Sequence, residues 1–286
     1  MKGVLFFAML SLYFNANSQV VSGCILNSLT LEPVPFATIA ALDANIATSA
    51  DSSGKFKFTV FIEANDTLLI SSVGFEETKL PVSLALTAPE IKLLPFRIQL
   101  DSLVLRSYRS VNTVNSFSSC GLHTFGSVGY SSQVARLFVA PKEFCRLKRI
   151  ELCKVGSDDR FRIRVYDFNT ANGFPGDDLL DTVLEVKSFK RNVQIDLSDY
   201  NIILPHKNFF IAIEWLFIQE NIDRVGRSKN SKLNQNPLVY YRPKLFGKNL
   251  KSDAISPLVH KTFQGQWLTL SRVGFDLLIS ADLDIP

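Results

Sequence analysis

The chain has 286 residues, of which 47% are hydrophobic and 11% aromatic, and it carries a formal net charge of +4. This apolar content excludes general disorder, and the length predicts two domains of ordinary size. No apolar run reaches the roughly 20 residues of a membrane-spanning helix, so we expect a chain that is at most peripheral to a membrane.

Residues 1–18 have the pattern of a secretory signal peptide. A lysine precedes an apolar run of about ten residues, and small residues stand at Ala16 and Ser18. This arrangement predicts cleavage before Gln19 and export of the mature chain.

A second N-terminal pattern overlaps the first. Residues 21–24, VSGC, have the composition of a bacterial lipobox, in which Cys24 would become a lipidated first residue. Polar and small residues separate this motif from the apolar run, and the same residues fit a first β-strand. We therefore expect cleavage before Gln19 and keep lipidation as the alternative.

Short β-prone runs separated by turns occupy residues 19–101. Phe56, Phe58 and Val60 alternate with polar residues, which is the period of a half-buried strand. Gly54 permits a tight turn before this run, because glycine tolerates positive φ. About seven strands at this spacing predict a small β-sandwich of Ig-like or prealbumin-like topology.

Four motifs follow one another in this region: EPVPFATI at 32–39, DSSGKF at 51–56, DTLLIS at 66–71 and VGF at 73–75. Their order resembles the carboxypeptidase-regulatory-like domain that is common in exported proteins of Bacteroidota. The resemblance implies a β-sandwich without peptidase residues, and a location in the periplasm, at the outer-membrane surface or outside the cell.

Residues 102–119 are rich in Ser and Asn and predict a linker, after which β patterning resumes over 120–286. Residues 160–166, RFRIRVY, predict a strand with its apolar side chains inward and its arginines facing water. Residues 209–216, FFIAIEWL, are apolar on both faces and predict a central strand of a packed sheet, with Trp215 in the core.

The succession FRIRVYD, NGFPGDDLL, VQIDLSDYNIILP and FFIAIEWL resembles a jelly-roll-like module found downstream of regulatory-like domains in Bacteroidota. The resemblance completes an all-β prediction: a small Ig-like or prealbumin-like β-sandwich followed by a larger jelly-roll-like β-sandwich. Residues 220–261 depart from the module and predict a long loop, with nine Lys or Arg against three Asp or Glu.

This basic loop is the predicted ligand-binding region, because loops at the ends of a sandwich carry recognition residues. Its charge and aromatic rings suit an acidic glycan, and an envelope protein is the other partner considered. The alternative is a solvated loop that carries solubilising lysines. The candidate residues, which include a tryptophan beyond the loop, are Tyr240, Tyr241, Arg242, Lys244 and Trp267.

Three aspartates follow the Asn-Gly-x-Pro-Gly turn at 172–176, namely Asp177, Asp178 and Asp181. Loop carboxylates of this kind can bind Ca²⁺, the one cofactor considered, and the alternative is a solvated acidic turn. The three histidines of the chain are not at metal-ligand spacing.

The cysteines are expected to be unpaired. On one strand, Cys145 and Cys153 would stand roughly 26 Å apart. That separation is too great for a disulfide between them. Cys120 could reach either one, but buried free thiols are favoured because free cysteine is among the most buried residue types.

No catalytic motif such as G-x-S-x-G or a P-loop occurs. The sequence predicts an exported, non-enzymatic, envelope-associated binding or structural protein, and nucleic acid is not an expected partner. The alternative is a hydrolase in which carboxylates of the second sandwich, such as Asp196, Asp199 and Glu214, come together.

Overall fold

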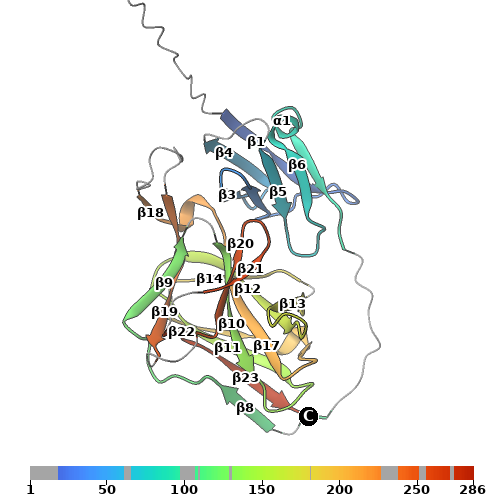
Figure 1. Cartoon of the computed structure of the whole chain (residues 1–286). Coiled ribbons are helices and arrows are strands. Elements are labelled where there is room, and N and C mark those ends of the chain that lie inside the picture. The colour runs from blue at the N-terminus through green and yellow to red at the C-terminus, as the bar shows by residue number, and fades with distance from the viewer. Residues whose placement is uncertain are drawn as a thin grey trace, which may run out of the picture.

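The computed structural model contains two β-rich lobes, a smaller first domain and a larger second domain (Figure 1). The predicted signal peptide lies outside the residues that it describes, and none of the helices within those residues is long and apolar enough to cross a membrane. The described residues are 19–60, 66–96, 107–108, 110–128, 131–180, 182–226, 238–250, 256–270 and 274–286.

The first domain is a sandwich of two sheets. A three-stranded sheet has the order β4-β1-β7, formed by β1 (Gln19–Asn27), β4 (Lys55–Val60) and β7 (Glu90–Leu93). A four-stranded sheet has the order β3-β2-β5-β6, formed by β2 (Thr38–Ala41), β3 (Ile46–Ser49), β5 (Thr67–Ser71) and β6 (Thr78–Pro81). A single helical turn, α1 (Val82–Ala85), follows β6.

Apolar side chains of the two sheets meet in a closed core, and this confirms the predicted Ig-like β-sandwich. Val21 of β1 and Ile70 of β5 are fully buried in it. The predicted turn before β4 is also confirmed. Gly54 has a φ of 74°, and a Cβ on it would lie 2.7 Å from the carbonyl oxygen of Ile25.

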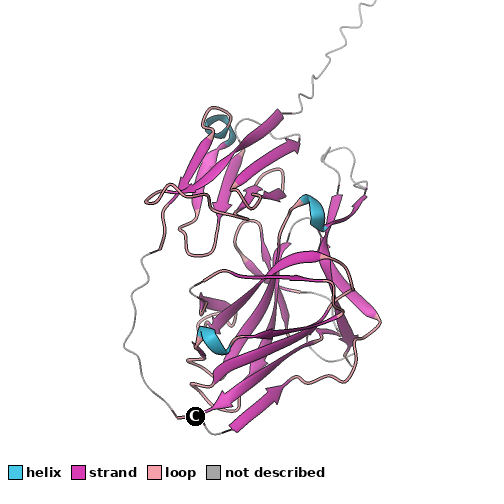
Figure 2. Ribbon diagram, turned by 180° about the vertical axis from the view of Figure 1, so that it is seen from behind, coloured by secondary structure: helices cyan, strands magenta, loops and turns pink. Residues whose placement is uncertain are grey.

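The second domain has one large sheet facing two smaller ones (Figure 2). The large sheet has the order β13-β12-β17-β10-β20-β21, with β14 also on β12. Its strands are β10 (Ser131–Val139), β12 (Asp159–Phe168), β13 (Pro175–Asp178), β14 (Leu184–Ser188), β17 (Asn208–Trp215), β20 (Leu258–Thr262) and β21 (Trp267–Thr269).

The first of the smaller sheets has the order β15-β11-β23-β8, with β16 also on β11, and the other has the order β18-β19-β22, with β9 also on β19. Their strands are β8 (Ser110–Val114), β9 (His123–Val128), β11 (Arg146–Cys153), β15 (Asn192–Asp196), β16 (Ile202–Ile203), β18 (Ile222–Gly226), β19 (Leu238–Asn249), β22 (Phe275–Leu277) and β23 (Ile279–Ile285). Short 3₁₀ turns, η1 (Ser198–Tyr200) and η2 (Gln219–Asn221), precede β16 and β18.

The core of the second domain lies between the large sheet and the two smaller ones. As predicted, the run FFIAIEWL forms the central strand β17, between β12 and β10. Trp215 is fully buried, and its indole N–H donates a hydrogen bond to the carbonyl oxygen of Pro243 at 2.9 Å. The all-β class is therefore confirmed, and the jelly-roll-like topology of the second domain stays a prediction.

Three sequence predictions on this domain are wrong. The predicted linker contains β8, which pairs with β23 and so belongs to the second domain. The described part of the predicted loop 220–261 is largely strand, because it contains β18, β19 and most of β20. The arginines of β12 do not all face water: Arg162 is only 1% exposed, since the first domain and the charged neighbours of this sheet cover that face.

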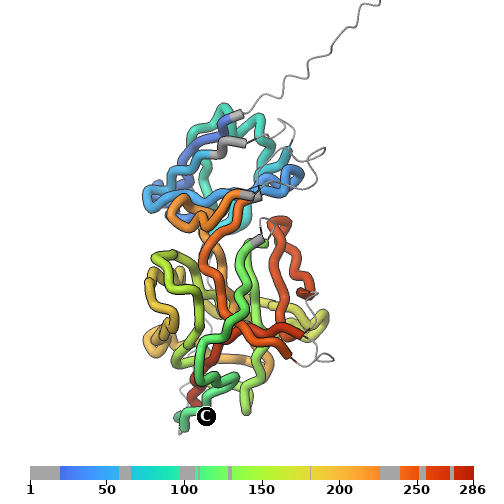
Figure 3. The backbone as a smooth tube through the Cα atoms, turned by 90° about the vertical axis from the view of Figure 1, so that its left-hand side faces the viewer, coloured from blue at the N-terminus to red at the C-terminus, as the bar shows by residue number. Residues whose placement is uncertain are grey.

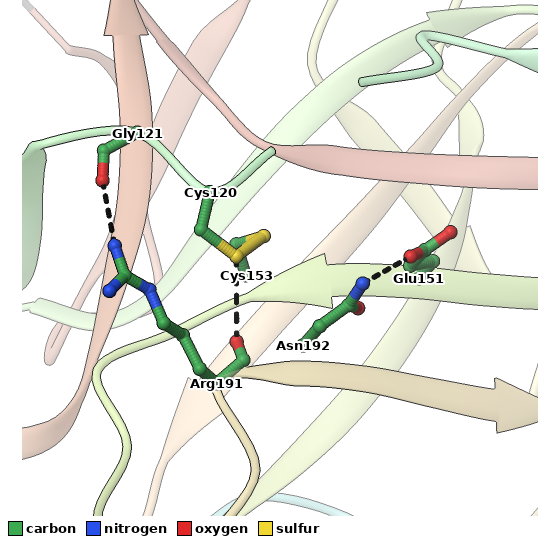
Figure 4. The surroundings of a disulfide bond; sticks show 6 residues. All are labelled: Cys120, Gly121, Glu151, Cys153, Arg191 and Asn192. Atoms are coloured by element: carbon green, nitrogen blue, oxygen red, sulfur yellow. Dashed lines mark hydrogen bonds between the residues drawn. A yellow bond between two sulfur atoms is a disulfide. The ribbon is translucent and has the colours of Figure 1, made fainter. Parts of the chain in front are cut away.

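The prediction of free thiols is wrong for two of the four cysteines. Cys120, just before β9, and Cys153, at the end of β11, form a disulfide with a Cα–Cα distance of 5.5 Å (Figure 4). Next to this disulfide, the Arg191 guanidinium donates a hydrogen bond to the carbonyl oxygen of Gly121 at 3.2 Å. Cys145 is buried and unbonded, so the prediction that it does not pair with Cys153 is correct.

Candidate functional site

The two domains are joined by hydrogen bonds as well as apolar contacts. The segment after β17, orange in Figure 3, rises to meet the first domain. There the backbone N–H of Phe217 donates to Ser49 Oγ at 2.9 Å. Arg162 donates to the carbonyl oxygen of Pro35 at 3.0 Å, and Phe36 packs in one apolar cluster with two residues of that segment.

A pocket of about 490 Å³ opens beside this junction, and we call it the interdomain pocket. The first domain contributes Phe36 and residues between Thr48 and Lys57. The second domain contributes residues 217–220, Ile222, Arg160 and Tyr241. The volume lies within the roughly 300–1,000 Å³ of typical ligand sites, which occur preferentially at domain interfaces.

The wall from the first domain is shaped by a tight turn. Asp51 Oδ1 accepts hydrogen bonds from the backbone N–H groups of Ser53 at 2.8 Å and Lys55 at 3.0 Å. Strand alternation then buries Phe56 and exposes the ammonium-bearing side chains of Lys55 and Lys57. The turn and the strand together place two cations on this wall.

The facing wall is held in place by a buried asparagine. Asn221 Oδ1 accepts a hydrogen bond from the backbone N–H of Arg160 at 3.0 Å, and its amide donates to the carbonyl oxygens of Arg160 at 2.6 Å and Leu216 at 2.9 Å. The guanidinium of Arg160 lies over the ring of Phe36, 5.2 Å from its centroid, and donates to Glu185 at 2.6 Å. A third cation is thereby fixed at the pocket.

Aromatic rings also line the pocket. Tyr241 meets Phe217 edge to face, with ring centroids 4.9 Å apart. Burial raises the pKa of the Tyr241 phenol to about 12. At neutral pH this hydroxyl is therefore uncharged and can both donate and accept a hydrogen bond.

The predicted ligand-binding residues do not form one site. Tyr240, Tyr241, Arg242 and Lys244 all lie on β19, and among them Tyr241 lines the interdomain pocket. The predicted Trp267 lies on β21 and packs edge-on against another aromatic ring of the large sheet. The two surfaces are separate.

The polar partners of β19 explain why its cations are not displayed together. The Arg224 guanidinium stacks on the ring of Tyr240 at 4.1 Å from the centroid. Arg242 donates to the backbone carbonyl of Glu220 at 2.5 Å, and Lys244 forms an ion pair with a neighbouring aspartate at 2.8 Å. Arg224, Arg242 and Lys244 are thus engaged within the chain.

The aspartates that were predicted to bind Ca²⁺ have different surroundings. Asp177 is exposed, Asp178 forms an ion pair with Arg164, and Asp181 lies outside the described residues. Within the described part of the chain, no group of three or more His, Cys, Asp or Glu side chains is arranged to hold a metal ion.

The carboxylates of the predicted hydrolase site are not brought together. Asp196 is exposed on β15, where its side chain accepts hydrogen bonds from Ser198 at the start of η1, which also contains Asp199. Glu214 lies on the other side of the core, on β17 of the large sheet, where it is buried against Arg162 at 3.6 Å. The convergence that the hydrolase alternative requires is therefore not found for these three residues.

Sequence reasoning missed the cations at the interdomain pocket. The alternation of Lys55, Phe56 and Lys57 shows that both lysines face away from the core of the first domain. It does not show that the second domain lies opposite them. Arg160 was assigned to solvent together with its neighbours on β12, because the pattern of one strand carries no information about domain docking.

Residues 21–105 match the model of the CarboxypepD_reg-like domain family. The match covers the first domain and confirms the resemblance carried by its motifs. No curated protein sequence matches the chain.

Some solved structures are distantly similar. The cysteine protease and lectin-like domains of Cwp84, a surface layer associated protein of Clostridium difficile, are 9% identical with a TM-score of 0.37, over 56% of this chain and 33% of that chain. A form of Cwp84 after propeptide cleavage is 11% identical with a TM-score of 0.41, over 79% and 53% of the two chains. The present chain thus spans about a third to a half of these proteases.

A protein from Bacteroides uniformis ATCC 8492, whose carbohydrate binding is proposed, is 12% identical with a TM-score of 0.21. The similarity covers 79% of this chain and 97% of that one. All three likenesses are too distant to indicate a function.

Proposed function

We propose that this protein is an exported, non-enzymatic, envelope-associated binding protein that holds a saccharide in the interdomain pocket. The observation that carries the proposal is the construction of that pocket from both domains, with buried aromatic rings and exposed charged groups together in its lining. Saccharides present hydroxyl groups for polar contacts and an apolar ring face for aromatic contacts, and the pocket offers both kinds of partner.

Export is supported by the chemistry of the cysteines. Disulfides persist in oxidising compartments and are rare in the cytosol. The Cys120–Cys153 disulfide therefore agrees with the signal-peptide pattern of residues 1–18. An envelope location also makes saccharides available as ligands.

A binding role is favoured over the hydrolase alternative by the placement of the carboxylates. The Glu214 side chain is buried beside the Arg162 guanidinium, and Asp196 caps a surface turn. Neither faces the interdomain pocket.

The proposal is tested by applying the mature chain, from residue 19 onward, to a glycan array that contains neutral and acidic saccharides. The double variant Lys57→Ala/Glu220→Ala removes two exposed charges of the pocket. The matched control Glu76→Ala/Lys79→Ala removes two exposed charges outside the pocket, one just before β6 and one on it. We expect binding by wild type and control, and reduced binding by the pocket variant. Absence of glycan binding by the wild type, or equal binding by all three proteins, would contradict the proposal.

A further inference from the structure

We infer that the interdomain pocket selects acidic saccharides, whose carboxylate or sulfate groups bind to Lys55, Lys57 and Arg160. This inference rests on the proposed function and adds the ligand class. The predicted acidic-glycan partner is retained here, and its site moves from the basic segment of β19 to the junction of the two domains.

The first step concerns the acidic groups of the pocket, which offset its cations only in part. Asp51 Oδ1 already accepts three hydrogen bonds, from the backbone of Ser53 and Lys55 and from the Ser53 hydroxyl at 2.7 Å. Burial acts to raise the pKa of Asp51, but these hydrogen bonds outweigh it and hold the pKa below its ordinary value. Asp51 Oδ1 is therefore engaged in its own turn, while the carboxylate keeps its negative charge. Together with Glu220 it gives the pocket two carboxylates against the three cations Lys55, Lys57 and Arg160.

The second step concerns the cations. Lys55 and Lys57 stand on the same face of β4, and both are exposed. The charge of Lys55 helps to lower the pKa of Asp51, and Lys57 forms no ion pair with a carboxylate of the described residues. Each ammonium has three donors for an incoming anion. The two side chains are spaced by two residues of a strand, which places them side by side along the wall of the pocket.

The third step concerns Arg160 on the facing wall. Its side chain is 30% exposed, and Nη1 is the atom that reaches Glu185. A guanidinium has five N–H donors in a planar fork, so one such contact leaves donors for a carboxylate or sulfate. Its position over the Phe36 ring fixes the plane of the fork. An anionic group in the pocket can thus be met from both domains.

Carboxylated and sulfated saccharides share this chemistry, and two matched probe pairs distinguish them. The first pair is polygalacturonate and its carboxyl-reduced form, and the second is a sulfated galactan and its desulfated form. We expect the acidic member of at least one pair to bind the mature chain roughly tenfold more tightly than its neutral partner, because charge-assisted hydrogen bonds are about twice as strong as neutral ones. Binding should weaken as salt is added, since exposed charges are screened.

The variant Lys55→Gln/Lys57→Gln removes both charges with little change in bulk, and Lys79→Gln/Lys92→Gln is the matched control on exposed lysines outside the pocket. The pocket variant should lose the preference for the acidic probe while its melting temperature stays unchanged, and the control should keep it. If the neutral members bind as well as the acidic members, the inference is overturned and the proposed function stands. If none of the four probes binds, the inference is overturned. The proposed function is tested separately by the glycan array.

Discussion

Ser49 and Phe217 form a reciprocal pair of hydrogen bonds across the boundary between the two domains. The backbone N–H of Ser49 donates to the carbonyl oxygen of Phe217 at 3.2 Å, and the backbone N–H of Phe217 donates to Ser49 Oγ at 2.9 Å. Both residues also line the interdomain pocket. The contact that joins the domains is therefore the same contact that shapes the candidate site.

We predict that Ser49→Ala destabilises the protein by about 1–3 kcal/mol, because it leaves the buried N–H of Phe217 without its acceptor. Urea unfolding followed by circular dichroism measures this change. The control is Ser22→Ala, an exposed serine of β1, which should have little effect. A loss of stability that is no larger for Ser49→Ala than for the control would show that the pair is dispensable.

The apolar pattern of the sequence predicted the strands of both domains better than it predicted which faces of those strands are covered by the other domain. The alternation in β12 identified the strand, and the unbroken apolar run of β17 identified its central place in the sheet. The same alternation assigned Arg162 to water, whereas the structure buries it beside Pro35 of the first domain. The alternation along a strand shows which residues share a face of the sheet. Whether that face is exposed to solvent depends on the docking of another domain, which the alternation does not show.

The buried pair of Arg162 and Glu214 gives a second prediction. Replacing one partner, as in Arg162→Met, should cost about 3–5 kcal/mol, because it leaves the other charge buried and unpaired. The double variant Arg162→Met/Glu214→Gln should be less destabilised than the sum of the two single variants. A double-mutant cycle of unfolding free energies measures this coupling, and strict additivity would mean that the two groups do not interact.

Similar reasoning explains why the disulfide was missed. Spacing along one strand correctly excluded a bond between Cys145 and Cys153, because that argument needs only strand geometry. The partner of Cys153 is Cys120, which lies in the connection between β8 and β9, and no local sequence pattern shows that this connection passes beside the end of β11. The interdomain pocket was missed for the same reason, since its walls come from separate domains.

The disulfide gives a third prediction. Because it closes a loop with a sequence separation of 33 residues, Cys120→Ser/Cys153→Ser should lower the free energy of unfolding by about 3–4 kcal/mol. Calorimetry with and without a reducing agent measures the effect, and reductant should lower the melting temperature of the wild type but not that of the double variant. Cys24→Ser, at an unbonded cysteine, serves as the control and should remain sensitive to reductant. A wild-type melting temperature that reductant does not change would contradict the prediction.

The ion pair between His206 and Asp167, at 2.9 Å, predicts a pH dependence of stability. The hydrogen bond to Asp167 and the charges of Asp167 and Glu143 raise the pKa of His206, and burial opposes them weakly. A raised folded-state pKa stabilises the protein below the unfolded pKa of about 6.5, and this contribution is lost as the pH rises through the folded value.

We therefore expect His206→Gln to lower stability at about pH 5 and to leave it nearly unchanged at about pH 8. The effect should be small, because the His206 side chain is 47% exposed and solvent screens the pair. Thermal unfolding of both proteins across this pH range provides the measurement. A difference that grows toward high pH would have the wrong sign.

The last prediction concerns the first residue of the exported protein. Cleavage before Cys24, as lipidation requires, would remove residues 19–23, which pair with β4 in the register Gln19↔Val60 to Gly23↔Phe56. It would also remove Val21, which is fully buried in the core of the first domain. Because that loss would leave an edge of the sheet unpaired and a gap in the core, we expect processing before Gln19 instead. Intact mass and N-terminal sequencing of exported wild type and Cys24→Ser should both give Gln19 as the first residue, and an acylated Cys24 in the wild type would overturn this expectation.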